Sequence, residues 1–176
     1  SLSERQGYRI QSSLGQEWAN EREAWSVTGQ ALSEAVIEKL KDLLGRGLDR
    51  PRFKGRGFPL AATFSDGRVF RDERLVSPND QAVMPLDFQY LPPQEDRRAE
   101  YWVNESSSEQ RRHRLVWVSA SPSNLEPKLR ELVRSRQMVA RYEGRLQSLP
   151  EPRRRLLYDE QTRRDSLENE VRSLVA

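Results

Sequence analysis

The chain has 176 residues, which is the length of one compact domain or of one domain with an appendage. Charged residues make up 32% and apolar residues 35%, so we expect a modest core and a large solvated surface. The net charge of +3 does not by itself indicate a nucleic-acid-binding protein, and the absence of cysteine excludes disulfides, thiolate zinc sites and cysteine nucleophiles.

Residues 1–50 contain no proline and are predicted as an N-terminal helical segment. After an extended start at residues 8–10, a capping-box pattern at Ser13 predicts the beginning of one helix. A second helix follows, because leucine and valine side chains recur there three to four positions apart. Gly45 is its predicted end.

Residues 51–122 are predicted as a β-rich core. A strand at 58–64 runs into Asp66-Gly67, a typical hairpin turn, and residues 68–70 are the predicted return strand. The last strand in this region is nearly all apolar, so we expect it at the centre of the sheet. The further predicted strands cover residues 84–91, 100–103 and 115–118.

Residues 123–176 are predicted as a helical hairpin. Ser123 and Ser148 each begin a capping box with a proline in the first helical turn, and the first helix should end near Leu146. The short connection favours an antiparallel pair. The fold class is therefore α/β of the α+β type, with N-terminal helices, a small mixed or antiparallel central sheet and this hairpin. Because the chain lacks an initial Met and stops at apolar residues 174–176, we expect it to be part of a larger protein.

Residues 45–57 form a segment rich in glycine and cations, which we call the glycine-basic loop. Its five positive side chains and one negative side chain give a local charge of +4. Glycines let backbone amides approach a phosphate, and arginines bind one in a bidentate manner. The alternative is a solvated connection between helix and strand. The predicted binding residues of this loop are Arg46, Arg50, Arg52, Lys54 and Arg56.

The first helix of the hairpin has a row of arginines opposite its apolar face, which we call the arginine row. At 100° per residue, the row comprises Arg130, Arg134, Arg141 and Arg145. Such a row can follow a phosphate backbone or an acidic partner, whereas the alternative is an ordinary solvated face. If the row binds DNA, exchanging all four arginines for glutamine should abolish binding.

An enzymatic site is not supported by the residues present. His113 is the only histidine and lies among arginines, so a hydrolase triad or a zinc site lacks its parts. Asp87, Glu126 and Lys128 match a metal-dependent nuclease pattern only loosely, and Glu126 is already explained by helix capping. We therefore predict no catalytic, metal-binding or cofactor-binding residue.

The tryptophans separate into two groups by their sequence surroundings. Trp25 lies on a predicted helix and Trp117 in the apolar strand, so both are predicted in the core. Trp102 stands beside a polar loop and is the tryptophan that we expect to be exposed.

Several segments in order resemble one bacterial family. They are Tyr8-Arg9-Ile10-Gln11-Ser12 running into Gln16-Glu17-Trp18 and Glu21, the basic segment and strand of residues 53–67, the apolar strand 115–118, and the helix 125–138. Together they are similar to the region that follows the ATPase module in the large P-loop ATPases of bacteriophage-exclusion (BREX) defence systems, of the BrxC/PglY kind.

This resemblance implies a cytoplasmic antiviral protein that acts against phage DNA within a multi-protein complex. It supplies no catalytic residues, because the Walker motifs of the family lie upstream of the matching region. The expected function is a non-catalytic interaction domain that contacts other subunits of the defence complex. The alternative is a sequence-independent nucleic-acid-binding domain that uses the arginine row and the glycine-basic loop.

The sequence also bears on whether the chain binds a membrane, DNA or a second copy of itself. No apolar run approaches the ~18 residues of a membrane span, so no membrane partner is predicted. DNA and a second copy of the chain are the further partners considered.

Overall fold

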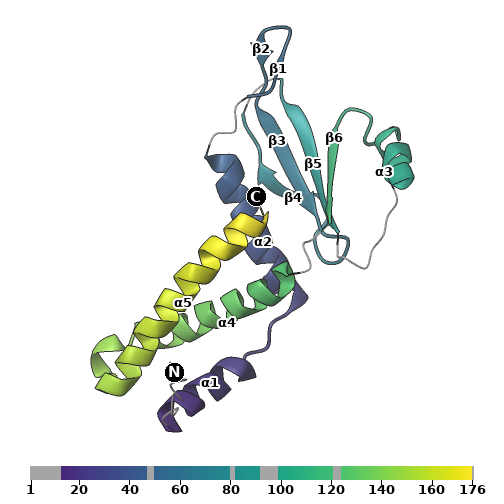
Figure 1. The fold of residues 1–176 in the computed structure, drawn as a ribbon. Helices are drawn as coiled ribbons and strands as arrows, with labels where there is room; N and C mark the ends of the chain where they lie inside the picture. Colours follow the sequence, from purple (N-terminus) through teal and green to yellow (C-terminus); the bar gives the residue numbers. More distant parts are fainter. Residues whose placement is uncertain (1–12, 47–49, 80–81, 92–98, 121–123, 176) are drawn as a thin grey trace, which may run out of the picture.

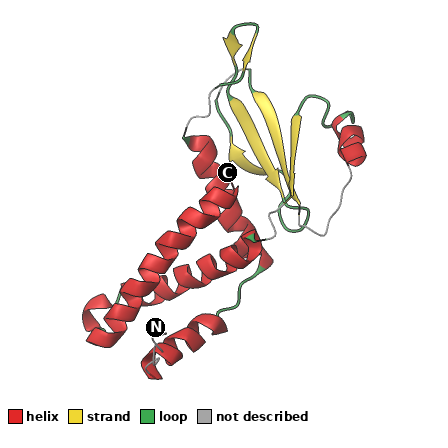
Figure 2. Cartoon of the chain, viewed as in Figure 1, coloured by secondary structure: helices red, strands yellow, loops and turns green. Residues whose placement is uncertain are grey.

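A computed structural model describes residues 13–46, 50–79, 82–91, 99–120 and 124–175. The chain has an α+β fold, as predicted, in which a sheet occupies one end of the molecule and a group of packed helices the other (Figures 1 and 2). Helix α2 lies between the two ends. The predicted extended start at residues 8–10 lies outside the described residues.

Two helices open the described chain, as the sequence predicts. Helix α1 (Ser13–Ala24) begins at the predicted capping residue, and helix α2 (Gly29–Gly45) ends at the predicted glycine. The Thr28 side chain caps α2 by accepting a hydrogen bond of 3.2 Å from the backbone N–H of Ala31. The apolar positions of α2 then fall on one face, which is buried.

The strands form a two-stranded hairpin and a four-stranded mixed sheet. In the larger sheet the order is β4-β3-β5-β6; β3 runs antiparallel to β4 and parallel to β5, and β5 runs parallel to β6. The hairpin consists of β1 (Arg52–Phe53) and β2 (Arg56–Gly57), and the sheet of β3 (Leu60–Ser65), β4 (Glu73–Val76), β5 (Met84–Leu91) and β6 (Leu115–Ala120).

The two faces of the sheet differ in chemistry because side chains alternate along each strand. Phe64 of β3 lies opposite Phe88 of β5, and both contribute to the core shared with the helices. Thr63 lies opposite Asp87 on the other face, where Asp87 pairs with Arg111. One face is therefore apolar and helix-covered, while the other carries buried polar groups.

The predicted helical hairpin is confirmed. Helices α4 (Leu125–Glu143) and α5 (Glu151–Val175) pack along each other, joined by a short 3-10 helix, η1 (Leu146–Ser148) (Figure 1). Helix α4 ends three residues before the predicted boundary, at Glu143. The predicted cap Ser123 lies outside the described residues.

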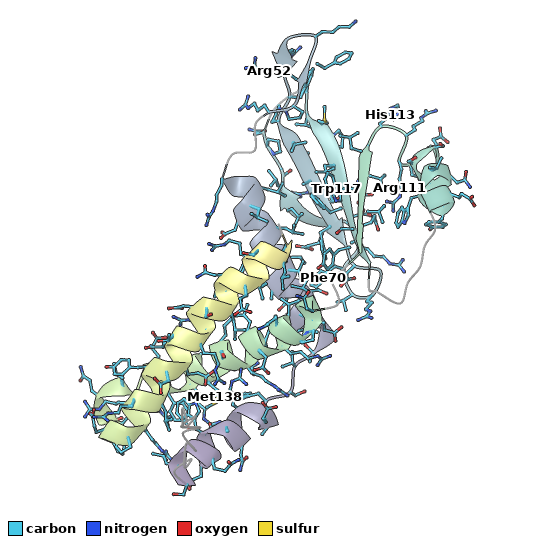
Figure 3. The ribbon with its side chains drawn as sticks, in the orientation of Figure 1. Arg52, Phe70, Arg111, His113, Trp117 and Met138 are labelled. Atoms are coloured by element: carbon cyan, nitrogen blue, oxygen red, sulfur yellow. The ribbon has the colours of Figure 1, made fainter. Side chains whose placement is uncertain are left out.

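The helices and the sheet share two hydrophobic clusters. The larger one joins α2, β3, β4, α4 and α5, with Phe64, Leu125 and Leu132 fully buried. The smaller one lies at the far end of the hairpin, where α1 packs on α4 and α5 through Trp18 and Met138. Figure 3 labels Met138 at this end. Trp25 packs against this second cluster, as predicted.

Two predicted strands are wrong. Residues 100–103 lie in helix α3 (Ala99–Ser106), because parallel strands β5 and β6 need a long crossover connection, which is usually helical. Residues 68–70 form a turn rather than a strand, because the Asp66 carboxylate binds their backbone N–H groups. The strand that returns beside β3 is β4.

The placement of the last strand and of two tryptophans is also corrected. Residues 115–118 belong to β6, which is an edge strand of the sheet rather than a central one. Trp117 is accordingly 59% exposed, because the helices cover the β3–β4 side of the sheet. Trp102, predicted to be exposed, is only 7% exposed because it lies on the crossover helix α3, which packs against β6.

Candidate binding surfaces

The arginine row of α4 is largely engaged in ion pairs within the protein. Arg134 contacts the Glu23 carboxylate of α1 at 2.5 Å, and Arg141 contacts Glu21 of the same helix at 3.0 Å. The guanidinium of Arg141 also lies over the Trp25 ring, 5.9 Å from its centroid. These contacts join α1 to α4.

The two ends of the row are more open. Arg130 pairs with Glu126 at 2.7 Å, one turn earlier on α4. Arg145 is exposed after the helix and has no ion pair within the described part of the chain. Three of the four arginines therefore already have a carboxylate partner, which weakens the field that a phosphate backbone would meet.

A buried ionic cluster lies where α1, α4 and α5 meet, and the sequence did not predict it. The Glu160 carboxylate of α5 accepts hydrogen bonds from Arg22 Nε at 3.0 Å, Ser135 Oγ at 2.6 Å and Trp18 Nε1 at 3.1 Å. Arg22 also pairs with Glu131 at 2.7 Å. Three helices are thus connected through one carboxylate, and every group in this set except Glu131 is buried.

The protonation behaviour of this cluster follows from its contacts. Burial raises the pKa of Glu160, but the hydrogen bonds from Ser135, Trp18 and Arg22 outweigh burial and hold its pKa below the ordinary value. Burial likewise lowers the pKa of Arg22, while Glu131 and Glu160 raise it to a net value above the ordinary one. Both groups therefore stay charged inside the protein.

A second ionic group ties α2 to α4 and α5. Arg136 of α4 donates to Glu38 at 2.7 Å and to Glu168 at 2.6 Å, and the buried Lys39 also pairs with Glu168. Hydrogen bonds from Arg136 lower the pKa of the half-exposed Glu38 carboxylate and outweigh its partial desolvation. These charges hold helices together and leave little free charge for a ligand.

The glycine-basic loop is divided by the structure. Arg46 is the C-cap of α2 and pairs weakly with Asp42 at 3.6 Å, and residues 47–49 lie outside the described residues. The rest forms the β1–β2 hairpin, which projects beyond the sheet (Figure 1). Its tip residues Lys54 and Gly55 have φ angles of 48° and 78°, as a two-residue turn of type I′ requires.

The hairpin presents cations and an aromatic ring to solvent. Arg50, Arg52, Lys54 and Arg56 are exposed, and none of them has an ion pair among the described residues. Phe53 is 63% exposed, with the Lys54 ammonium 5.5 Å from its ring centroid. Figure 3 shows Arg52 at this projecting end of the molecule.

The polar cluster on the sheet is internally satisfied. Asp87 accepts hydrogen bonds from Thr63 at 3.3 Å and Gln89 at 3.0 Å, and pairs with Arg111. Glu126 is the other acidic residue of the loose nuclease pattern. Together with Phe64 it lines a cavity on the opposite face of the sheet, which the helices cover. The sheet therefore separates the two carboxylates. Among the described residues, no group of three or more acidic, histidine or cysteine side chains could hold a metal ion.

The cavity between α2, β3 and α4 contains Asp66, whose hydrogen bonds are already made. Its carboxylate accepts three backbone N–H bonds of 2.8–2.9 Å from Arg68, Val69 and Phe70, and one of 2.6 Å from Ser33 Oγ. Burial raises its pKa, but these bonds outweigh burial and lower it overall. The cavity volume of about 70 Å³ is far below the roughly 300–1,000 Å³ of small-molecule sites.

Edge strand β6 carries an exposed apolar surface that sequence reasoning placed in the core. Leu115 is 53% exposed and Trp117 is 59% exposed, and the Trp117 ring lies 6.1 Å from that of Phe88. The three residues before the strand, Arg112, His113 and Arg114, are exposed as well. Figure 3 labels His113 and Trp117. The nearly all-apolar sequence of this strand carries no signal for the exposure, which follows from its place at the edge of the sheet.

No protein-family model, curated protein or solved structure matches the chain. No helix among the described residues is long and apolar enough to cross a membrane.

Proposed function

We propose that this chain is a non-catalytic interaction domain that binds a partner protein along edge strand β6. In this proposal the partner supplies an extended segment with apolar side chains and acidic flanks. Following the resemblance to the BREX ATPases, the partner is another subunit of a cytoplasmic phage-defence complex, and the domain passes the nucleotide-driven changes of its parent ATPase to that subunit.

The outer edge of β6, at residues 115–118, is the observation that carries the proposal. Among the described residues this six-residue strand pairs with one other strand, β5, so the peptide groups of residues 115–118 along its outer edge can accept another strand. The opposite edge strand, β4, has only four residues and packs against the long helix α2, whereas β6 has six residues and meets the shorter helix α3. Strand addition is therefore favoured at β6.

The side chains of β6 supply apolar contact area next to this edge. Leu115 and Trp117 lie on the same face of the sheet as the core residues of β5, but past the area that the helices cover. Exposed tryptophans are enriched among the residues that dominate protein interfaces, because they bury a large area at little entropic cost. An added strand would cover Trp117 and the neighbouring Phe88 ring.

The charge beside the strand identifies the chemistry of the partner. Arg112, His113 and Arg114 are exposed immediately before β6. Among the described residues, the one acidic side chain that pairs with any of them is Glu109, whose carboxylate lies 3.8 Å from Arg112. Acidic side chains flanking the incoming segment would complement this field, whereas basic ones would be repelled.

Two synthetic peptides test this proposal. Both carry the same alternating apolar core, and one has glutamate flanks where the other has lysine flanks. We expect the glutamate peptide to protect the backbone amides of β6 from hydrogen exchange and to bind at least about tenfold more tightly than the lysine peptide, a difference of ~1.4 kcal/mol. Equal binding of both peptides, or protection elsewhere in the chain, would contradict the proposal.

A matched pair of variants separates the surface from nonspecific apolar contact. Trp117→Ala should weaken binding of the glutamate peptide strongly, whereas Tyr158→Ala, which removes a similarly exposed ring from α5, should not. In the longer parent protein, Trp117→Lys should release the partner subunit while ATP hydrolysis continues. Retention of the subunit would contradict the proposed assembly role.

A further inference from the structure

The β1–β2 hairpin has the features of a second binding surface, separate from β6. It lies at the end of the molecule beyond the sheet, and none of its residues belongs to either hydrophobic cluster (Figure 1). Four cations and an exposed phenylalanine are gathered within the short segment 50–56. Neither the core nor the β6 surface uses these side chains.

The cations of the hairpin are available to an external anion. Arg50, Arg52, Lys54 and Arg56 have no carboxylate within ion-pair distance among the described residues. In contrast, Arg134 and Arg141 of α4 are held by carboxylates of α1. Within the described residues, a phosphate approaching the hairpin would therefore meet no competing carboxylate, whereas one approaching α4 would compete with existing partners.

The turn geometry fixes the direction of these side chains. The register pairs Phe53 with Arg56, so the ring and this guanidinium lie on the same face of the hairpin. Arg56 also lies over the Phe58 ring, 5.4 Å from its centroid, and Lys54 lies over Phe53 at 5.5 Å. Arg56 therefore shares one face of the hairpin with Phe53, Lys54 lies beside that ring at the tip, and Arg52 points to the opposite face.

This combination fits unpaired nucleotides better than it fits a duplex. A base in single-stranded nucleic acid has a free face on which an aromatic ring can stack, while cations beside the ring bind the backbone phosphates. In this arrangement the ring stacks on a base face and the cations bind phosphates, so no side chain contacts the base edges where sequence is read. Recognition by this hairpin would therefore be independent of sequence.

We propose that the β1–β2 hairpin binds single-stranded nucleic acid, with Phe53 stacked on one base and Arg52, Lys54 and Arg56 on the adjoining phosphates. Binding at this site does not require β6 to be free. The chain can accordingly hold a nucleic-acid strand and a partner protein at the same time.

Fluorescence anisotropy of a labelled oligothymidylate, titrated with the whole chain at several salt concentrations, tests the proposal. The triple variant Arg52→Gln/Lys54→Gln/Arg56→Gln should reduce the slope of log affinity against log salt by about 2, since each lost phosphate contact contributes about 0.7. The matched control replaces Arg153, Arg154 and Arg155 of α5 with glutamine and should leave that slope unchanged. Equal losses in both triple variants would overturn the proposal.

Phe53→Ala separates stacking from charge. We expect it to weaken oligothymidylate binding about tenfold while leaving the salt slope unchanged, because stacking contributes without releasing counterions. Binding to a blunt duplex should change far less. Equal weakening on the duplex, or no weakening on the single strand, would overturn the stacking assignment.

Two further probes address other anionic macromolecules. Poly-glutamate and vesicles rich in phosphatidylserine should compete poorly for the hairpin, because neither offers an unpaired base. If either competes as well as the oligothymidylate, the hairpin is a general polyanion surface and the proposal is wrong. Circular dichroism of each hairpin variant should match that of the parent chain, since the hairpin lies outside both cores.

Discussion

Helix α4 and the β1–β2 hairpin both carry a group of cations, yet the two groups have different surroundings. On α4, Arg134 and Arg141 meet carboxylates of α1, and Arg136 meets carboxylates of α2 and α5. In the hairpin, the cations face solvent beside an exposed aromatic ring. Positive charge holds helices together in the first region, whereas in the second it has no carboxylate partner among the residues that the structure describes.

This difference shows that a row of cations in the sequence locates positive charge but does not say whether that charge pairs within the protein or binds a ligand. The spacing of the α4 arginines indicates which helix face they occupy, but α1 covers part of that face and supplies the opposite charge. The hairpin projects past the sheet, and no described element brings a carboxylate to it. Tertiary neighbours therefore decide which basic group can bind a ligand.

The largest effect in this comparison is expected from removing a buried charge in the helical region. Glu160→Gln should lower the free energy of unfolding by about 3 kcal/mol, because it leaves the buried Arg22 guanidinium with a weakened set of partners. Urea denaturation monitored by circular dichroism measures the change. Glu151→Gln, which removes an exposed carboxylate paired with Arg154, is the control and should cost less than about 1 kcal/mol. Similar losses in both variants would contradict the structural role of the buried cluster.

A second test asks whether an ion pair also stabilises the sheet. Arg111→Met leaves the buried Asp87 carboxylate without its cation, and we expect a loss of about 2 kcal/mol, since Arg111 is still 24% exposed and water can enter. Arg112→Met, at the exposed neighbouring position, should change stability by about 0.5 kcal/mol or less. Thermal unfolding of the two variants compares these effects directly. Equal stability would mean that Gln89 and Thr63 alone satisfy Asp87.

Acidification should reproduce part of the loss seen on removing Glu160. The folded-state pKa of Glu160 lies below its ordinary value, so its contribution is complete above the unfolded pKa of about 4.3 and disappears as the pH falls through the lower folded value. Asp66 and Glu38 have lowered pKa values and act in the same direction. Unfolding free energies measured from neutral pH down to this range should fall less steeply for Glu160→Gln than for the parent chain. Parallel curves would exclude Glu160 as a contributor.

The local features of the fold were predictable from the sequence. Gly45 ends α2, Ser13 begins α1, and the apolar spacing of α4 places Leu125, Leu129 and Leu132 in the core. Each of these depends on capping or periodicity within one element. Such signals need no knowledge of which elements meet.

The features that were missed depend on contacts between distant segments. Arg22 and Glu160 are 138 positions apart, and no local pattern connects them. Trp117 lies in an apolar strand, but its exposure follows from the strand order and from the helices stopping short of β6. Trp102 is buried because the crossover between parallel strands is a helix that packs on β6. For the candidate sites, sequence identified the cations but not their partners.

The smallest expected effect is also the sharpest test of the comparison between the two basic groups. Arg130→Gln and Arg141→Gln each remove one exposed ion pair, so each should change the free energy of unfolding by only about 0.2–1 kcal/mol. Oligothymidylate affinity and its salt dependence should stay at the parent level, because both arginines already have carboxylate partners. If the double variant instead binds weakly and its salt slope falls, α4 contributes phosphate contacts despite its ion pairs. The arginine row would then join the hairpin in one continuous nucleic-acid surface.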